Sequence, residues 1–342
     1  MIRKKAALVF LALFGIVIIT QNLRAEVSEA RSGTRMADME SKTRNEEKLA
    51  LKRIHEISRR NAARKNKERL AAFRRRNSSD HEDTPLIFIV TPTYPRPAQL
   101  ADMTRLCNTL MNVPDIHWIV AEDFDKENPR LRELLDFCGV PFTFLNARTP
   151  WIFRYGKVFG RGVFNRNAAL AWIRRESAAI RGDRPSVVYF ADDDNAYDIR
   201  LFGEIRKTKK ISMFPVGCIS GTGVSTPIVH RNGSLLGFHD NFYKERIYPI
   251  DMAGFAVNTD LILNSTAEFE RKTGYLEDHF LRDLQFHNGE IEFLADNCTR
   301  ILVWHVRTEP ADPIVSEKVI SSLQPLIEDS NLSELFENYA VN

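Results

Sequence analysis

Three adjacent aspartates, Asp192, Asp193 and Asp194, are the strongest chemical signal in the sequence. They follow the apolar run Val187 to Ala191, which is typical of a buried strand. Adjacent carboxylates repel one another unless a cation is present, and hard divalent ions take oxygen ligands while keeping positions open for phosphate. The triplet therefore predicts a divalent metal that bridges to a diphosphate and neutralises charge on a leaving group. An exposed acidic turn is the alternative.

Further polar groups stand after predicted strands or at helix starts. Tyr94 lies between Pro92 and Pro95, and a rigid loop that presents an aromatic ring suits stacking under a base. A loop tyrosine packed on the core is the alternative. Arg161 and Arg166 flank the start of a predicted helix, where cations do not complement the helix dipole. A nearby anion accounts for them, either a diphosphate or a carboxylate of a surface salt bridge.

Two more candidates lie near the end of the chain. His305 and Arg307 follow the apolar run Ile301 to Trp304, and residues i and i+2 of an extended chain point the same way. Both can face one phosphate, or the histidine is satisfied internally and the arginine faces solvent. Glu277 and Asp278 begin a predicted helix, where successive side chains point about 100° apart. Only one of them can aim into a cleft, where it would act as general base on a hydroxyl.

Alternating strands and helices are predicted to position these groups. The first half of the chain has strand-like runs at 85–90, 117–121, 142–145 and 187–191, and helical segments at 98–111, 129–138 and 163–180. This alternation predicts βαβ units and an α/β fold with a mostly parallel sheet flanked by helices. Ligands of such sheets bind beyond the carboxyl ends of the strands. Tyr94, Asp123 and the aspartate triplet are therefore expected along one crevice.

The second half is less regular. Apolar runs predict further strands and tight turns at 213–217, 237–239 and 252–257, a helix at 276–286 and a strand at 300–305.

Charge is distributed unevenly over the 342 residues. Residues 1–76 hold 20 Lys+Arg and 8 Asp+Glu, a balance of +12, which leaves 28 and 37, a balance of −9, for residues 77–342. An acidic globular part gives little support to nucleic-acid binding.

The N-terminal segment predicts a membrane anchor. An apolar run begins at residue 6 after Arg3, Lys4 and Lys5, and it lacks a clean cleavage site. The run is shorter than the roughly 20 residues of an ordinary span, but thin early-secretory membranes accept shorter ones. A cleavable signal peptide is the alternative. The basic flank predicts a cytosolic N-terminus and a luminal remainder.

Sequons and cysteines bear on the same question. Asn-x-Ser/Thr sequons, which suit a luminal domain, occur at Asn77, Asn232, Asn264, Asn297 and Asn331. The four cysteines show no zinc or disulfide-scaffold spacing, and each is predicted to be a small buried residue.

These observations divide the chain into segments. We predict a cytosolic tail (1–5), a signal anchor (6–23), a charged stem (24–83), a catalytic domain (84–313) and a C-terminal tail (314–342). Within the catalytic domain, residues 84–197 form the nucleotide-binding half and residues 198–313 the acceptor-binding half.

Seven motifs together resemble one enzyme family. They are Thr91-Pro-Thr-Tyr94, Glu122-Asp123, Tyr189-Phe-Ala-Asp-Asp-Asp-Asn195, Pro215-Val-Gly217, Asp251-Met-Ala-Gly-Phe-Ala-Val257, Asn297-Cys-Thr299 and Val303-Trp-His-Val-Arg-Thr-Glu309. In this order, over residues 85–313, they resemble the β-1,3-glucuronyltransferases of glycosyltransferase family 43.

The resemblance implies a type II Golgi membrane protein with a GT-A-like fold. It implies Mn²⁺-dependent, inverting transfer of glucuronic acid from UDP-glucuronic acid to O3 of a terminal galactose on a glycoprotein or proteoglycan-linker glycan. It also implies a homodimer.

The resemblance also implies a role for each matched residue. Tyr94, Asp123, Arg161, Arg166, Asp192 and Asp193 would contact UDP, mainly its uridine, and His305 and Arg307 would hold the diphosphate. Asp194 would bind the metal, Glu277 would deprotonate the acceptor, and Arg246 and Asp251 would bind its galactose.

One position departs from the pattern. Ser225 stands where the proteoglycan-linker enzymes of the family carry a glutamate that contacts acceptor sugar, although Gly237-Phe-His239 resembles that branch. The acceptor therefore stays open between the proteoglycan linker and N-acetyllactosamine-type glycans. A glycan-binding protein of the same fold without catalysis, and a metal-dependent phosphohydrolase, are the competing hypotheses.

Overall fold

The structure is a computed structural model, and it describes residues 53, 84–153, 161–242, 244–270 and 274–309. All of these except Arg53 belong to one compact unit, Asn66–Asn342. The predicted cytosolic tail, signal anchor and C-terminal tail, nearly all of the stem, and the sequons Asn77 and Asn331 lie outside the described residues. Within the described part of the chain, no helix combines the length and apolarity that crossing a membrane requires.

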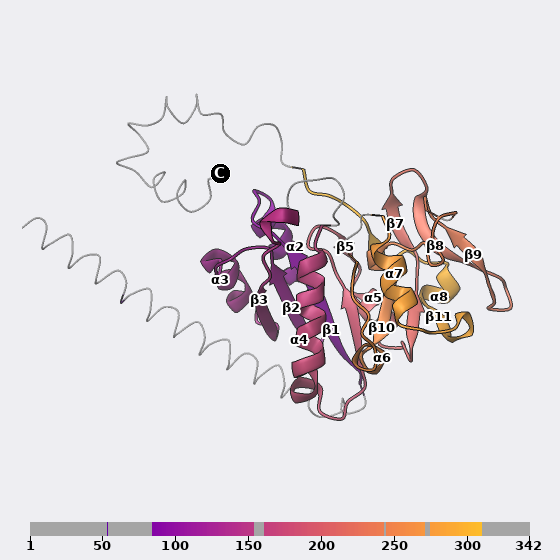
Figure 1. Cartoon of the computed structure of the whole chain (residues 1–342), viewed down its shortest axis with the longest axis horizontal. Coiled ribbons are helices and arrows are strands. Elements are labelled where there is room, and N and C mark those ends of the chain that lie inside the picture. Colours follow the sequence, from indigo (N-terminus) through magenta and orange to yellow (C-terminus); the bar gives the residue numbers. More distant parts are fainter. Residues whose placement is uncertain (1–52, 54–83, 154–160, 243, 271–273, 310–342) are drawn as a thin grey trace, which may run out of the picture. The chain divides into compact units, whose positions relative to one another are not determined.

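A seven-stranded sheet forms the centre of the domain (Figure 1). Its strands are β1 (Leu86–Thr93), β2 (Ile116–Glu122), β3 (Phe142–Asn146), β4 (Ser186–Phe190), β6 (Ile211–Met213), β10 (Phe255–Asn258) and β11 (Ile291–Phe293). The strand order is β11-β6-β10-β4-β1-β2-β3. All pairs are parallel except those of β10, which runs antiparallel to β4 and β6. The expected mostly parallel sheet is confirmed.

Helices cover both faces of this sheet, which explains why β1, β2 and β4 are buried along their whole length. Ile87 and Ile89 of β1 pack into one core cluster with α2 (Gln99–Leu110) and α3 (Pro129–Cys138). Phe88 and Val90 pack into the opposite cluster with α4 (Val163–Arg181). Alternate residues of a strand point to opposite faces, so the two sets of helices sandwich the sheet.

A second, smaller sheet was not expected from the sequence. It consists of β5 (Ala196–Tyr197), β7 (Val216–Ile219), β8 (Gly223–Val229), β9 (Leu235–His239) and β12 (Val303–Trp304), in the order β5-β12-β7-β8-β9. The remaining elements are α5 (Arg200–Ile205), α6 (Thr259–Leu263), α7 (Leu276–Asp283), α8 (Leu294–Cys298) and the 3₁₀ turns η1 (Trp151–Phe153), η2 (Met252–Gly254) and η3 (Asn288–Glu290). In Figure 1 the strands β7, β8 and β9 lie at the end of the domain away from α3.

Two of the predicted strands need correction. The run 213–217 is divided between β6 of the large sheet and β7 of the small one, because the chain leaves one sheet at Phe214 and Pro215. Proline has no N–H for a strand ladder, so it suits this break. The predicted strand at 300–305 is reduced to the two residues of β12, and the predicted helix at 276–286 ends at Asp283.

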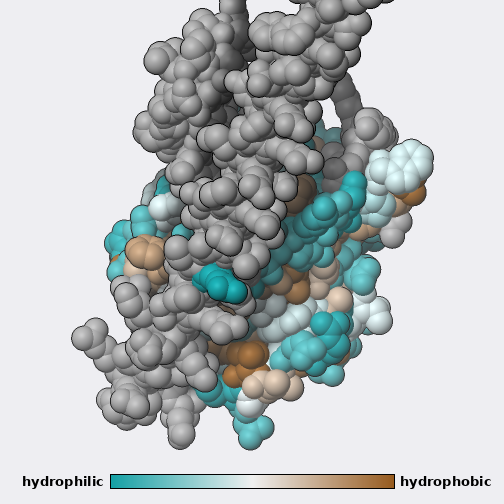
Figure 2. Space-filling view, turned by 90° about the vertical axis from the view of Figure 1, so that its left-hand side faces the viewer, coloured by the Kyte–Doolittle hydropathy of each residue, from teal (hydrophilic) through white to brown (hydrophobic). Residues whose placement is uncertain are grey.

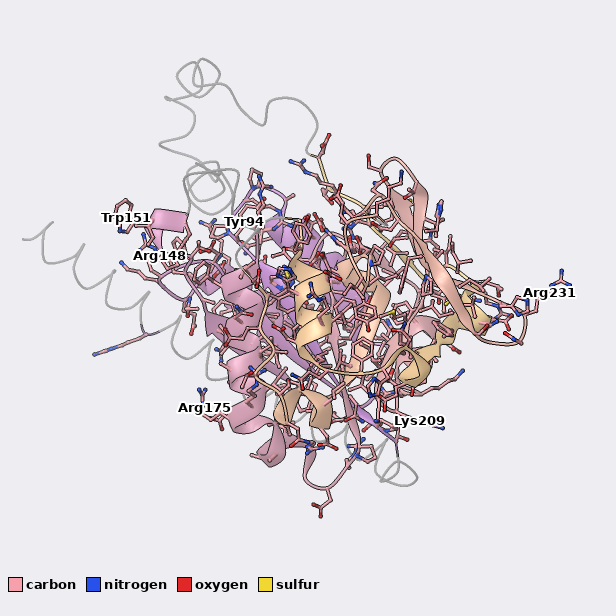
Figure 3. All side chains as sticks on the ribbon, turned by 45° about the vertical axis from the view of Figure 1, so that its right-hand side comes forward. Tyr94, Arg148, Trp151, Arg175, Lys209 and Arg231 are labelled. Carbon is pink, nitrogen blue, oxygen red and sulfur yellow. A yellow bond between two sulfur atoms is a disulfide. The ribbon has the colours of Figure 1, made fainter. Side chains whose placement is uncertain are left out.

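The part of one face that Figure 2 shows in colour is mixed in character. On the face drawn in Figure 2, hydrophobic residues form small separate patches among hydrophilic ones. Long cationic side chains such as Arg175, Lys209 and Arg231 project away from the ribbon in Figure 3. Small exposed apolar patches such as those in Figure 2 are ordinary for a folded domain.

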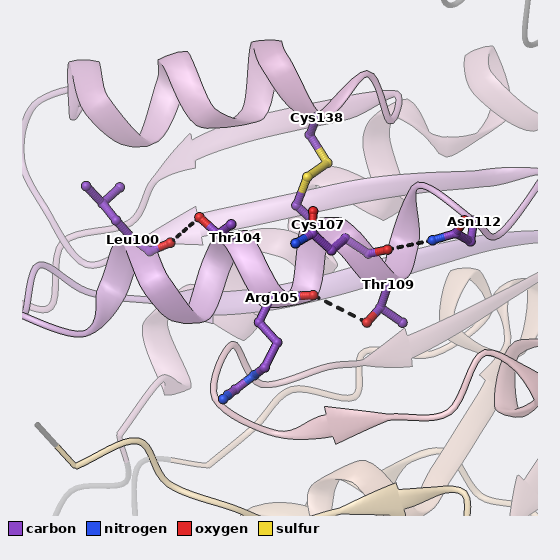
Figure 4. The surroundings of a disulfide bond; sticks show 8 residues. Leu100, Thr104, Arg105, Cys107, Thr109, Asn112 and Cys138 are labelled. Atoms are coloured by element: carbon purple, nitrogen blue, oxygen red, sulfur yellow. Dashed lines mark hydrogen bonds between the residues drawn. A yellow bond between two sulfur atoms is a disulfide. The ribbon is translucent and has the colours of Figure 1, made fainter.

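A disulfide joins α2 to α3 and corrects the prediction for two cysteines. Cys107 and Cys138 are buried, as expected, but they are bonded to each other, with Cα atoms 5.9 Å apart (Figure 4). Cys218 and Cys298 are free, and the prediction of burial is wrong for both, since Cys218 is exposed and Cys298 is half-buried. Spacing alone missed the pair because the two residues become neighbours only when both helices pack on the same face of the sheet.

Replacing both Cys107 and Cys138 by serine is expected to lower the free energy of unfolding by about 2–4 kcal/mol, the usual effect of removing a native disulfide. The bond spans 31 residues of chain, so its loss frees a long loop in the unfolded state. Denaturant unfolding measures the change. Cys218→Ser, at an exposed free cysteine, is the control and should leave the midpoint unchanged. Equal midpoints for the double variant and the wild type would contradict the stabilising role.

Candidate active site

The carboxyl ends of three neighbouring strands meet, as predicted, at one edge of the large sheet. β1 pairs in parallel with both β2 and β4. The hydroxyl of Thr93, the last residue of β1, donates to Asp193 Oδ2 at 2.6 Å, and the Asp123 amide donates to the Thr93 carbonyl at 2.8 Å. Asp123 and the aspartate triplet therefore lie on either side of the end of β1.

The three aspartates have three different environments. Asp192 forms an ion pair with Arg166 at 2.5 Å. Asp193 is buried and also accepts from Arg96 Nη1 at 2.7 Å. The Asp194 carboxylate accepts no hydrogen bond and forms no ion pair with any residue that the structure describes. Burial and the adjacent charges of Asp193 and Asp192 raise the pKa of Asp194 to about 6.

Asp194 fits a hard divalent cation. It offers carboxylate oxygens in a half-buried place where neighbouring negative charge is only partly compensated. Among the described residues, no group of three or more His, Cys, Asp and Glu side chains could hold a metal by itself. One or two carboxylates completed by substrate phosphates and water is the arrangement that Mg²⁺-like ions use with phosphate substrates.

Arg166 lies in the first turn of α4 and is buried. Its Nη2 donates to Asp192 and its Nη1 donates to the Arg161 carbonyl at 3.1 Å, whereas the Arg161 side chain is exposed. The carboxylate of Asp192 is thus the anion that explains Arg166 at a helix N-terminus. Gly162, with φ of 72°, closes this turn, and a Cβ there would stand 2.8 Å from Arg166 Nη1.

The Asp123 carboxylate is fixed by hydrogen bonds, whereas the Tyr94 side chain is largely exposed. The Asp123 carboxylate is fixed by the Thr149 amide at 2.6 Å and the Thr149 hydroxyl at 2.7 Å. Tyr94 is 46% exposed, and Figure 3 shows it on the upper side of the domain in that view. The Arg96 guanidinium lies 4.8 Å from the centroid of its ring, a distance that suits a cation–π contact. The ring is accessible enough to stack under a base, as the first interpretation requires.

Sequence reasoning missed Arg96 at this edge and gave no role to Glu122. Arg96 joins Asp193 to Asp102 of α2, and Glu122 is fully buried at the end of β2. Burial raises the pKa of Glu122, against hydrogen bonds from Asn128 at 3.0 Å and Gln99 at 2.9 Å. An arginine between two prolines looks like an ordinary loop residue, and no local pattern indicates partners about a hundred residues away.

His305 and Asp251 form the second cluster. His305 Nδ1 lies 2.9 Å from Asp251 Oδ2, while Asp251 Oδ1 accepts from the Ala253 amide at 2.9 Å. The Asp251 amide in turn donates to the hydroxyl of Ser225, which is fully buried. The hydrogen bond to Asp251 raises the pKa of His305 to about 9, so its ring is an imidazolium at neutral pH.

This arrangement bears on two expectations. The Asp251 carboxylate, expected at the acceptor, contacts His305 in this structure. Arg307 is exposed and lies 3.8 Å from Glu309, and its expected contact with a diphosphate, shared with His305, stays a prediction.

The His305 ring is expected to titrate near pH 9 in an NMR titration of its side-chain resonances. Asp251→Asn removes the anion that holds the proton, so the midpoint should fall toward the ordinary value near 6.5. Asp240→Asn is the control, because the one bond of the Asp240 carboxylate within the described part of the chain is to the Phe242 amide, two positions on. A His305 midpoint that stays near 9 in Asp251→Asn would refute the role of the pair.

Glu277 and Asp278 begin α7, and the structure distinguishes them. Asp278 is buried and accepts from the amides of Ile247 and Tyr248, each at 2.8 Å. It is therefore a structural residue. Glu277 contacts the side chain of Arg246, whose Nη1 donates to it at 3.0 Å.

Glu277 keeps the properties of a base. Burial raises its pKa, and the charge of Arg246 only partly opposes this. Arg246 is itself fixed, because its Nε donates to the Gly274 carbonyl at 2.7 Å and its guanidinium lies 4.2 Å from the centroid of the Phe242 ring. A carboxylate held in a half-buried place with a raised pKa suits proton abstraction near neutral pH.

Electrostatic contacts connect the clusters. The charge of Asp251 contributes to raising the pKa of Glu277, and the charges of Asp192 and Asp194 contribute to raising that of His305. Glu277 therefore lies within electrostatic reach of Asp251 and Arg166, and His305 lies within reach of Asp192 and Asp194. The sequons Asn232, Asn264 and Asn297 are all exposed, and Asn297 has φ of 55° in the left-handed turn of α8.

Known proteins resemble this chain closely. The sequence profile of glycosyltransferase family 43 matches residues 106–309. Galactosylgalactosylxylosylprotein 3-beta-glucuronosyltransferase S of Drosophila melanogaster is 46% identical over 232 residues, which are 68% of this chain and 55% of that protein. The sqv-8 protein of Caenorhabditis elegans, with the same enzyme name, is 45% identical over 71% of this chain and 69% of its own length.

The human enzyme 1 of the same name is 43% identical over 66% of this chain and 70% of that protein. The chain thus spans about half the length of the Drosophila relative and about 70% of the other two. The profile match covers Asp123, the aspartate triplet, Glu277 and His305. The chain belongs to glycosyltransferase family 43.

Proposed function

We propose that this protein transfers glucuronic acid from UDP-glucuronic acid to O3 of a terminal galactose, with inversion at the anomeric carbon. The single observation that carries the proposal is Glu277, a half-buried carboxylate whose pKa burial raises and on which the charge of Arg166, the partner of Asp192, also acts. The names of the relatives, which are 3-beta-glucuronosyltransferases acting on galactosylgalactosylxylosylprotein, support the sugar and the linkage.

Asp194 is proposed to hold Mn²⁺ together with the diphosphate of the donor. When bound, the ion would neutralise charge on the departing UDP. The imidazolium of His305 and the guanidinium of Arg307 are proposed to contact the same diphosphate. Asp192 and Asp193 do not need to bind the metal, since Arg166 and Arg96 already compensate their charges.

The uridine is proposed to lie against the ends of β1 and β2. The exposed ring of Tyr94 would stack on the base, and the fixed carboxylate of Asp123 would accept from it. Arg161, Arg166, Asp192 and Asp193 complete this part of the proposed donor site.

In the chemical step, Glu277 takes the proton from O3 of galactose as that oxygen bonds to the anomeric carbon. The bond from that carbon to UDP breaks in the same displacement, so one base suffices and the configuration inverts. Arg246, which contacts Glu277, and Asp251, whose charge acts on it, are proposed to bind the acceptor galactose beside it. Holding both reactants in line supplies much of the acceleration.

We further propose a Golgi location, with the chain anchored through residues 6–23 and the catalytic domain in the lumen. The Cys107–Cys138 disulfide supports an oxidising compartment, and the exposed sequons Asn232, Asn264 and Asn297 are compatible with glycosylation there. Assembly as a homodimer stays a prediction.

The test is a transfer assay with the full-length chain, UDP-glucuronic acid and Mn²⁺. Two acceptors are compared, a Galβ1-3Gal linker analogue and N-acetyllactosamine. Transfer to at least one of them that stops on chelation supports the proposal. Tight UDP binding without transfer to either acceptor would favour a glycan-binding protein, and metal-dependent phosphate release without acceptor would favour a phosphohydrolase.

A further inference from the structure

The segment that carries His305 and Arg307, residues 305–308, leaves the small sheet and reaches helix α2 of the large one. We refer to it as the strap. The His305 amide donates to the Gly217 carbonyl at 2.9 Å, and the Val306 amide lies 3.3 Å from Asn195 Oδ1, beside the aspartate triplet. At its end, the Thr308 hydroxyl donates to Asp102 Oδ1 at 2.5 Å.

Asp102 of α2 is an unusual residue because its charged side chain is only 1% exposed. Both of its carboxylate oxygens accept hydrogen bonds. Oδ2 accepts from Arg96 Nη2 at 2.7 Å. Oδ1 accepts from Arg105 Nη2 at 3.2 Å as well as from Thr308. A buried carboxylate requires such partners, and its conversion to a neutral group leaves two arginines without their shared anion.

The same two arginines contact the aspartate triplet. Arg96 Nη1 donates to Asp193 Oδ2 at 2.7 Å. Arg105 Nη2 donates to the Asp194 carbonyl at 2.5 Å. The Arg105 side chain leaves α2 on the side opposite the Cys107–Cys138 disulfide (Figure 4). It therefore does not interfere with the side of α2 that is bonded to α3.

We propose that Asp102 is a positioning residue that clamps the strap to the aspartate triplet and so sets the distance between the diphosphate contacts and Asp194. The inference rests on the proposed function. Asp102 cannot touch substrate, since it is buried and its oxygens are used by Arg96, Arg105 and Thr308. It acts on donor binding through the position of the strap.

This clamp predicts a specific kinetic signature. A strap that is free to move away from the triplet weakens the hold on the diphosphate before it affects the proton transfer at Glu277. Removing an interaction of this supporting kind commonly costs about 10–100-fold in affinity or activity. KM for UDP-glucuronic acid is therefore expected to rise by roughly tenfold or more in Asp102→Asn and Thr308→Val, with a smaller change in kcat.

The test uses the full-length chain with Asp102→Asn, Thr308→Val and the double variant. KM for UDP-glucuronic acid, kcat, and UDP affinity by calorimetry with Mn²⁺ present are measured for each. Because both changes break the same contact, the double variant should lose much less than the product of the single losses. Thr308→Ser, which keeps the hydroxyl, should restore KM to near the wild-type value.

Thr109→Val is the matched control, because the Thr109 hydroxyl, as far as the described residues show, bonds the Arg105 carbonyl of its own helix. It should leave KM and UDP affinity unchanged. The proposal is overturned if Thr308→Val binds UDP like the wild type, or if the losses of the two variants multiply. A wild-type chain that transfers no sugar would overturn the proposed function instead, while the calorimetric comparison would still decide whether the clamp exists.

Discussion

Glu277→Gln is expected to lower kcat by roughly 10²- to 10⁴-fold, the contribution typical of a general base. Glutamine keeps the size of the side chain and can still accept from Arg246, so donor binding should be almost unchanged. Turnover of the full-length chain at saturating substrate measures the loss. Calorimetric UDP binding checks that the fold and the donor site survive the change.

The pH dependence of kcat gives a second, independent test of Glu277 as the base. Glu277 must be deprotonated to act, and burial raises its pKa. In the wild type, kcat should therefore rise with pH through that raised pKa, and the residual rate of Glu277→Gln should lack this rise. Glu176→Gln, at a partly exposed carboxylate paired with Arg175, is the control and should behave like the wild type. Retention of most of the wild-type kcat in Glu277→Gln would remove Glu277 from the mechanism.

Asp194→Asn is expected to lower kcat/KM by roughly 10²- to 10³-fold, comparable to removing one electrostatic contact to a developing negative charge. The amide of asparagine is a weaker ligand for a hard cation than a carboxylate. Arg166 pairs with Asp192 and Arg96 pairs with Asp193, so among the described residues Asp194 is the aspartate of the triplet that has no cationic partner. The measurements are the Mn²⁺ dependence of turnover and of UDP binding. Both should be lost or shifted to much higher Mn²⁺.

Asp183→Asn gives the matched control, since Asp183 is exposed in the turn before β4. Its Mn²⁺ dependence should equal that of the wild type. If Asp194→Asn and Asp183→Asn showed the same Mn²⁺ dependence, the ion would have to bind elsewhere in the chain or act without the triplet.

The central part of the fold could be predicted because its signals are local. β1, β2 and β4 are short apolar runs buried on both faces, and α3 begins after the cap Asn128 and ends at Gly139 in the left-handed conformation. Strand ends of parallel neighbours meet by geometry alone. The convergence of Asp123 with the triplet followed from the order of these elements.

The small sheet could not be predicted because its signals are weak. β12 has two residues, and β8 contains Gly223 and Pro227, which argue against a strand. β8 pairs with β7 through Gly223–Ser225 and with β9 through Thr226–Val229. Pro227 is tolerated because neither pairing extends along the whole strand. The predicted run 213–217 lacked any sign that its two halves belong to different sheets.

The site itself was predictable by residue type and not by partner. Sequence spacing treated Asp192, Asp193 and Asp194 as one unit, whereas long-range arginines give each a separate environment. Likewise, helix geometry stated only that one of Glu277 and Asp278 faces a cleft. The choice depended on backbone amides of residues 247 and 248, about thirty positions away.

The most direct test of the account is the structure of the product. The full-length chain is incubated with UDP-glucuronic acid, Mn²⁺ and a ¹³C-galactose-terminated acceptor, and the new linkage is determined by NMR. A single displacement with Glu277 as base predicts glucuronic acid joined to O3 of galactose in the β configuration. An α-linked product, a linkage to another hydroxyl, or release of UDP without any sugar on the acceptor would contradict it.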